Sequence, residues 1–253
     1  MIKGLYAAAS AMLVNANRQQ LLSHNISNME TPGFKQILTS VEEFTQTNVI
    51  FPADDITRSN RLRAIGILGL GSMMGPEVVD YAQGALQQTG NLYDLAISGD
   101  GFFTVQTPDG TRYTRDGRFL RSPEGQLVTF EGYAVLNQGG QPITLPEGDL
   151  SVAPDGRISI NGEEVAQLGL ANFADPRAEL ERTEGNLFTA TGQPTGEATP
   201  RVAQGFLEMS NANPTQLMAQ LVEVGRSYEI AQQMVSNQDD LLGKTISMLG
   251  RIG

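Results

Sequence analysis

Several residue types are absent or scarce in this chain of 253 residues. It has no Cys and no Trp, a single His, and aromatic residues make up 6%. Without Cys there can be no disulfide, no thiolate nucleophile and no Cys-ligated metal. A zinc site built around one His, His24, would need mostly carboxylate ligands, which is unusual. We therefore expect no metal and no cofactor.

Basic charge is also in short supply. The chain has 17 Lys and Arg against 28 Asp and Glu, a formal net charge of −11 and a pI near 4.6. Nucleic acids and anionic membranes attract basic surfaces, so neither is expected as a partner. The one basic cluster, Arg58, Arg61 and Arg63, is short and is interpreted as a solvated stretch. No apolar run approaches the ~20 residues that cross a bilayer, so membrane insertion is not expected.

Residues that suggest catalysis do not form a convincing site. Asp94 and Asp100 flank LAISGDGFF as a possible carboxylate pair, but nothing nearby suggests a sugar-stacking cleft. Ser23 and His24 are adjacent in sequence, whereas the members of a triad meet through the fold. The glycine run over 66–75 lacks the spacing and the Lys of a phosphate loop, and is interpreted as an extended, flexible connector. The sequence predicts a protein that is not an enzyme.

The middle of the chain has the pattern of short strands separated by turns. Asp-Gly, Glu-Gly and Asn-Gly pairs, which tight turns favour over calcium loops, recur mostly six to eight residues apart between Asp109 and Gly162. Strands are predicted at Phe102–Val105, where the two Phe side chains are expected at the core and the rim, at Gln126–Thr129 and at Arg157–Ile160. The Gly-, Thr- and Pro-rich segment Gly185–Pro200 is expected to be a loop or an excursion at a sheet edge.

The N-terminal segment has the spacing of an amphipathic helix. MIKGLYAAASAMLV has some features of a signal peptide, but the helical spacing continues to Gln20, so a retained helix is expected. A heptad seam with small side chains follows spacings of four and three: Leu5, Ala9, Met12, Ala16, Gln19, Ser23 and Ile26.

A longer helix is predicted near the C-terminus, over Pro214–Ile252. Asn213 suits the cap and Pro214 the first helical position, and the helix would measure ~58 Å at ~1.5 Å per residue. Its first apolar stripe keeps the four-three spacing throughout: Leu217, Leu221, Val224, Tyr228, Ala231, Val235, Gln238, Leu242, Thr245 and Leu249. One antiparallel partner helix would cover this stripe.

A second stripe lies roughly 100° around the same helix, at about 100° per residue. It consists of Ile230, Met234, Leu241, Met248 and Ile252. This surface either packs on the protein's own middle domain or is covered by neighbouring copies in an assembly, and the helix length favours the assembly. From these stripes and the N-terminal seam we predict a set of subunit-packing residues. They are Leu217, Leu221, Val224, Tyr228, Val235, Leu242 and Leu249 of the first stripe, Met234, Leu241 and Met248 of the second, and Leu5, Met12 and Ile26.

These patterns predict an α+β multidomain protein. Residues 1–30 and 211–253 are expected to form paired, coiled-coil-like terminal helices, and residues 84–210 an all-β domain. Residues 31–83 would be the extended connector between them.

Three motifs span both termini and the first half of the β domain. The N-terminal motif centres on Asn25, Asn28, Thr31, Pro32, Gly33 and Phe34. The central motif is at Gly84, Thr89, Gly90, Asp94, Gly99, Asp100, Gly101, Phe102 and Phe103, and the C-terminal motif is at Gly205, Glu208, Ser210, Asn211, Tyr228 and Glu229. In this order the motifs resemble those of the bacterial flagellar rod and hook axial proteins.

The resemblance implies a structural protein that assembles helically around the export channel of the flagellum and transmits torque. It implies terminal helices packed as an inner tube, and partners among copies of itself and other rod and hook proteins. The sequence leaves open whether the P-ring and L-ring proteins contact this subunit. It also implies delivery to the periplasm-spanning rod by the flagellar type III export apparatus, without a cleaved signal. The size favours a rod subunit over the hook protein, and RVAQGFLEMSN and GALQQTGN favour the distal over the proximal rod, although residues 45–75 depart from the distal pattern. The alternatives are a hook- or junction-type axial protein, or a soluble β-domain module that binds glycan or peptide and oligomerises through a coiled-coil stalk.

Overall fold

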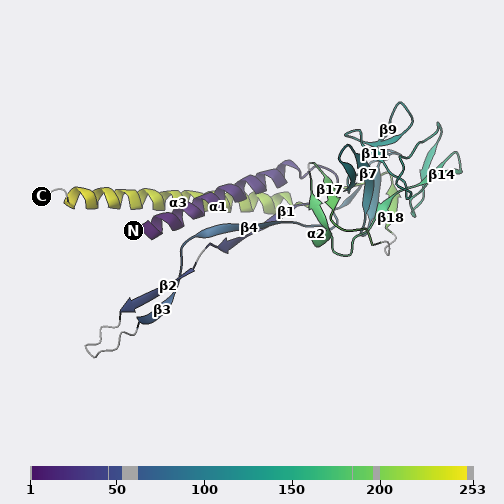
Figure 1. Ribbon diagram of the computed structural model, residues 1–253. Coiled ribbons are helices and arrows are strands. Elements are labelled where there is room, and N and C mark those ends of the chain that lie inside the picture. The colour runs from purple at the N-terminus through teal and green to yellow at the C-terminus, as the bar shows by residue number, and fades with distance from the viewer. Residues whose placement is uncertain (1, 45, 53–61, 184, 196–199, 250–253) are drawn as a thin grey trace. The chain divides into compact units, whose positions relative to one another are not determined.

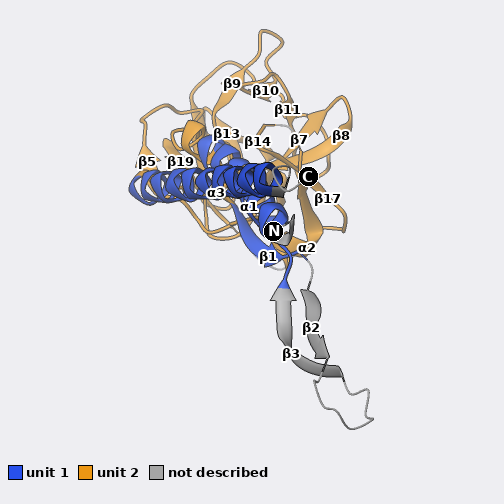
Figure 2. Cartoon of the chain, turned by 90° about the vertical axis from the view of Figure 1, so that its left-hand side faces the viewer, with its two compact units in different colours: residues 1–24, 38–77, 215–253 blue, residues 25–37, 78–214 orange. Residues whose placement is uncertain are grey.

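The chain forms two compact units. The computed structural model describes residues 2–44, 46–52, 62–183, 185–195 and 200–249. The first unit comprises residues 1–24, 38–77 and 215–253, and the second comprises residues 25–37 and 78–214 (Figure 2). Each unit therefore contains segments from both halves of the sequence.

Two long helices dominate the first unit. Helix α1 spans Ile2–Ser27 and helix α3 spans Pro214–Leu249, 36 residues and ~54 Å. They run side by side in opposite directions (Figure 1). Helix α3 begins at Pro214 as predicted, and the predicted last turn, 250–252, lies outside the described residues. Neither helix, over its described residues, has the length of apolar sequence that crossing a membrane requires.

The segment between α1 and the β domain consists of paired strands. Strand β1 (Ile37–Glu43) pairs with β4 (Ser72–Val79), and β2 (Gln46–Pro52) pairs antiparallel with β3 (Leu62–Gly69). The residues expected to form an extended, flexible connector thus form hydrogen-bonded ladders.

The glycines of the 66–75 run belong to β3, β4 and the turn between them, where they permit close packing. A Cβ built on Gly71 would lie 2.6 Å from Ser10 Oγ, and one on Gly75 would lie 2.3 Å from Ser40 Oγ. The backbone N–H of Ser72 donates to Ser10 Oγ over 3.1 Å, which holds the start of β4 against α1. The run serves backbone packing, and a phosphate-loop interpretation does not fit it.

The second unit is almost entirely β. Its strands are β5 (Leu86–Gln88), β6 (Leu95–Ser98), β7 (Phe102–Thr107), β8 (Gly110–Thr114), β9 (Phe119–Arg121), β10 (Leu127–Thr129), β11 (Ala134–Val135), β12 (Leu150–Val152), β13 (Arg157–Ile160), β14 (Glu163–Gln167), β15 (Leu170–Ala171), β16 (Leu180–Arg182), β17 (Leu187–Ala190), β18 (Arg201–Gln204) and β19 (Phe206–Glu208). A short helix, α2 (Pro176–Glu179), precedes β16. The α+β class is confirmed.

The strands form one large sheet and several small ones. The large sheet has the order β16-β17-β8-β7-β11-β10-β9, with β15 also paired to β7. Strands β12, β13 and β14 form a three-stranded sheet, and the pairs β18-β6 and β19-β5 bring the last strands of the unit against its first. The main core lies among these sheets and includes Phe103, Phe119 and Ile158.

The three strands predicted in this unit are confirmed as β7, β10 and β13, since alternating apolar residues between turn pairs mark them clearly. The prediction for Gly185–Pro200 is wrong over β17. This strand lies inside the large sheet, between β16 and β8, and its Phe188 is only 2% exposed. Tertiary burial overrides the turn-rich composition there.

Candidate functional site: a buried charge cluster and exposed helix faces

The carboxylate of Glu208 lies at the centre of a buried set of charges in the second unit. Lys35 Nζ is 2.5 Å from its Oε1, and Arg115 Nη1 is 3.0 Å from its Oε2. The backbone N–H of Gly84 also donates to Oε1 over 3.0 Å. These three charged side chains, hereafter the charge cluster, are at most 4% exposed.

The two cations of the cluster have further partners. Lys35 Nζ donates to the carbonyl oxygen of Ala82 over 2.8 Å, and Arg115 Nη2 donates to that of Gly99 over 2.8 Å. The guanidinium carbon of Arg115 lies 5.0 Å from the centroid of the Phe102 ring. Burial lowers the pKa of Lys35, and attraction to the carboxylate opposes this shift. The cluster is a fixed, dehydrated arrangement whose charges depend on one another.

Sequence reasoning reached only part of this cluster. The family resemblance identifies Glu208 and the neighbouring Gly84 and Gly99, but it does not single out Lys35 or Arg115. The only sequence signal for either residue is a charge within a short motif, Lys35 in PGFK and Arg115 in YTRDG. Nothing in the sequence indicates that these two strings converge on one carboxylate.

Glycines of the motif permit close backbone approach around the cluster. Gly33 has a φ of +71°, and a Cβ built on it would lie 2.3 Å from the backbone nitrogen of Asp116. A Cβ on Gly84 would lie 1.8 Å from the carbonyl oxygen of Met209. Any side chain at either position would displace backbone.

Two buried motif amides bind the backbone of the segments beside the cluster. Asn25 donates through Nδ2 to Ile37 O over 2.8 Å and accepts from Ile37 N over 3.1 Å. Asn211 accepts from Gln36 N over 2.8 Å and donates to Asp80 O over 2.8 Å. These side chains replace backbone partners where strand β1 begins and where β4 has ended.

The remaining N-terminal motif residues form a turn. Thr31 Oγ1 donates to Asn28 Oδ1 over 3.4 Å, and the carbonyl oxygen of Pro32 accepts from Asn186 Nδ2 over 3.0 Å. Phe34 is 1% exposed, with the guanidinium of Arg182 5.2 Å from its ring centroid. The motif is thus a folded segment of the second unit.

The central motif contains a second turn, and its carboxylates do not form a catalytic pair. Asp94 accepts from Thr89 Oγ1 over 2.6 Å and from Asn91 Nδ2 over 3.0 Å, while its carbonyl oxygen accepts from Gly205 N over 2.8 Å. Asp100 is exposed. The carboxylate of Asp94 holds the side chains of Thr89 and Asn91 in this turn, so its role in the motif is structural.

Phe102 and Phe103 correct the expectation of one core and one rim position. They are 2% and 0% exposed and belong to two separate buried clusters. Both faces of β7 are covered at this point, so neither ring lies at a rim. Gly99 and Gly101, with φ of +95° and +136°, form the turn that precedes the strand.

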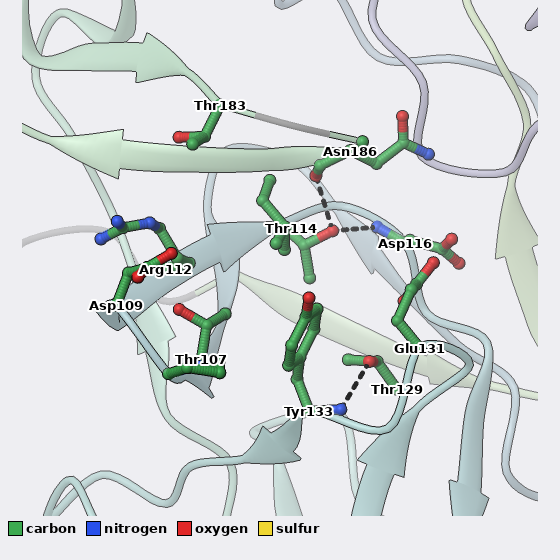
Figure 3. A pocket seen from close by; sticks show the side chains of 13 residues that line it. Thr107, Asp109, Arg112, Thr114, Asp116, Thr129, Glu131, Tyr133, Thr183 and Asn186 are labelled. Atoms are coloured by element: carbon green, nitrogen blue, oxygen red, sulfur yellow. Dashed lines mark hydrogen bonds between the residues drawn. The ribbon is translucent and has the colours of Figure 1, made fainter.

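The second unit also has a pocket of about 520 Å³, lined by residues of β8 and of turns that include Asp109, Glu131 and Gly185 (Figure 3). The buried hydroxyl groups in its lining form hydrogen bonds with backbone atoms. Thr114 Oγ1 donates to Asn186 O over 3.0 Å and accepts from Asp116 N over 3.0 Å, and Thr129 Oγ1 accepts from Tyr133 N over 3.2 Å. Within the described part of the chain, no three His, Asp or Glu side chains are grouped to hold a metal ion.

The first stripe of α3 is buried in its first half only. Leu217, Val224 and Ala231 are at most 5% exposed. Leu221, Tyr228, Val235, Gln238 and Leu242 are half-buried and Thr245 is exposed, while the side chain of Leu249 lies outside the described ones. A Cβ built on Gly4 of α1 would lie 3.6 Å from Gln238 Nε2, so the helices lie close together there. The first stripe therefore becomes less buried toward the C-terminal end of α3.

The second stripe of α3 is exposed along its whole described length. Ile230, Met234, Leu241 and Met248 are each at least 50% exposed. At about 100° per residue they lie within about 40° of one another around the helix. Among the residues that the structure describes, none covers this apolar line.

In α1, the buried residues differ from the predicted seam. The buried apolar residues are Ala8, Val14, Leu21 and Leu22, and Asn25 is also buried. Of the predicted seam, Leu5, Met12 and Ile26 are half-buried, while Ala9, Ala16, Gln19 and Ser23 are exposed. Alanines occupy several faces of this helix, so periodicity does not fix its phase. Tyr6 and Leu13 add exposed apolar surface, at 68% and 64%.

Within the described residues, the motif side chains bind backbone atoms and the two long helices carry exposed apolar lines, an arrangement typical of a structural protein. Three family models match the sequence in order. They are described as flagella basal body rod protein (residues 5–35), flagellar hook protein FlgE/F/G D1 domain (96–160) and flagellar basal body rod FlgEFG protein C-terminal (203–248).

Relatives match over the full length. The flagellar basal-body rod protein FlgF of Caulobacter vibrioides is 34% identical, with all of both chains covered, and FlgF of Rhizobium meliloti is 34% identical over 99% of each. FlgG of Bacillus subtilis is 30% identical over 98% of this chain and 99% of the relative. The chain belongs to the flagellar basal-body rod protein family. It is a structural subunit of the rod in the flagellar basal body, and not an enzyme.

Proposed function

We propose that the second stripe of α3 packs against neighbouring subunits when the rod assembles. The observation that supports this most directly is the alignment of four apolar side chains, each at least half exposed, on one helix face. Contiguous apolar surface of this kind is rare on chains that remain monomeric. Copies of this chain and other rod and hook proteins are the partners that family membership supplies.

In this proposal the first stripe, with Leu5, Met12 and Ile26, also contributes to packing within and between subunits. Subunits stack helically around the export channel, and close-packed helices resist shear, so torque passes from motor to hook. Delivery uses the flagellar type III export apparatus without a cleaved signal. The P-ring and L-ring proteins surround the part of the rod that spans the periplasm.

Leu241→Asp tests the stripe. A charge at this half-exposed position costs the free subunit little, but burying it between subunits would leave it unpaired. Cells carrying Leu241→Asp in place of the wild-type chain should not swim and should lack complete rods, while the purified variant keeps the wild-type melting temperature of its β unit.

The matched control is Val222→Asp, on the same helix and 55% exposed, but about 100° away from the stripe. It should permit rods and swimming. Normal rods in the Leu241→Asp strain, or equal failure of both variants, would contradict the proposed surface.

The distal position in the rod stays a prediction, supported by RVAQGFLEMSN and GALQQTGN. Basal bodies imaged in a deletion strain should carry a short rod stub if the subunit is distal. Loss of the rod from its base would instead indicate a proximal position.

A further inference from the structure

We propose that the charge cluster is a latch: residues 25–37 can lock onto the second unit only after strand β19 is in place. The inference is independent of the assembly surface. It concerns the order in which the chain's own parts become fixed.

The contacts of residues 25–37 show which later residues their docking requires. The backbone N–H of Gly33 donates to Glu208 O over 2.7 Å, and Lys35 Nζ meets the carboxylate of the same residue. The backbone N–H of Gln36 donates to Asn211 Oδ1 over 2.8 Å. The two side-chain contacts span 173 and 175 positions of sequence. An N-terminal segment is therefore held by residues close to the other end of the chain.

The charge of Lys35 explains why residues 25–37 need Glu208 in order to dock. In the docked state Lys35 is 2% exposed and next to a second cation, Arg115. Without the carboxylate of Glu208, docking would bury an ammonium group that keeps only the carbonyl oxygen of Ala82 as a hydrogen-bond acceptor and the more distant charge of Asp80 as a counter-ion. Removing one partner of a buried ion pair leaves an uncompensated charge, which is strongly destabilising. The segment then favours the solvated, undocked state.

The sign of the neighbouring charges strengthens this point. Arg115 directly follows β8 in the second unit and precedes β19 in the sequence, so it is synthesised before Glu208. Its charge repels Lys35 until Glu208 pairs with both. A chain that emerges amino end first therefore keeps residues 25–37 undocked until Glu208 has emerged.

The experiment compares amide hydrogen exchange in the full-length wild type and Glu208→Gln. Gln keeps the shape and an acceptor for the N–H of Gly84, but removes the anion. Protection at Gly33 and Gln36 should fall about 100-fold or more. Protection at Val105, in the core strand β7, should change by less than about threefold, which excludes general unfolding.

Asp155→Asn is the charge-matched control, since it also removes one negative charge but from an ion pair that is about half exposed. It should leave exchange at Gly33 and Gln36 unchanged. Adding Lys35→Met to Glu208→Gln should restore most of the protection, because the segment no longer carries a charge into the core. Losses that simply add in the double variant would overturn the latch.

Pulse labelling during refolding of the wild type needs no variant, and so decides the matter even if Glu208→Gln does not fold. The amides of Gly33 and Gln36 should become protected together with or after those of β5 and β19. Protection of Gly33 and Gln36 before β19 would overturn the proposal.

Discussion

Single motif residues in this subunit act on the backbone around them. Glu208 joins Lys35 and Arg115 in the core, Asn25 and Asn211 replace backbone partners, and Gly33 and Gly84 let chain segments touch. None of these roles needs a ligand. The family motifs therefore preserve a folded junction within the second unit.

Gly84→Ala tests this at the residue scale. The added methyl group would meet the carbonyl oxygen of Met209 at 1.8 Å, so backbone must move. We expect a loss of about 1–3 kcal/mol or more in the free energy of unfolding of the β unit, measured by thermal or urea denaturation.

Gly225→Ala in α3 is the matched control, because nothing lies within 4 Å of a Cβ built there. It should leave the unfolding of the β unit unchanged. Equal effects from the two substitutions would show that close approach at Gly84 is unimportant.

The sequence predicts such residues by type but not by contact. Glycine and Asn in the motif strings could be recognised as special positions. The meeting of Lys35 with Glu208 could not, because a side-chain pair 173 positions apart leaves no periodic signal. Phe102 and Phe103 show the same limit, since burial of both faces of β7 depends on the sheets that cover it.

At the scale of elements, helix α3 combines a covered beginning and an uncovered end. Between Ala231 and Met248, none of its described side chains is buried. Helices gain most of their stability from packing, so the second half should open more readily in the free subunit.

Limited trypsin digestion should therefore cut the free chain after Lys244 well before it cuts after Arg226, although both side chains are exposed. Mass spectrometry of the first fragments identifies the order. Simultaneous cutting, or no cut in either half, would show that α3 is equally stable along its length.

Periodicity and turn residues predict that a helix or strand exists more reliably than they predict which of its faces is buried. Pro214 fixed the beginning of α3, and branched or large apolar residues fixed its stripes. In α1 the seam was misplaced because Ala7, Ala8, Ala9 and Ala11 give several faces the same weight. Strand β17 was missed because Gly, Thr and Pro surround a short apolar pair whose burial comes from the neighbouring strands.

At the scale of the whole molecule, this rod subunit is a folded β unit together with helices that have more apolar surface than the chain itself covers. We propose that the line of four exposed apolar residues on α3 packs against neighbouring subunits in the rod. The proposed assembly requires that other subunits cover this line of side chains.

The most direct measurement uses the absence of Cys from the chain, since one introduced thiol can be labelled alone. Met234→Cys places it in the stripe, and Asp155→Cys places it at an exposed control position of the second unit. Both should react rapidly with a maleimide in the free chain. In purified rods the account predicts protection of the thiol at position 234 and continued labelling at position 155, and equally fast labelling at position 234 in rods and free chains would contradict it.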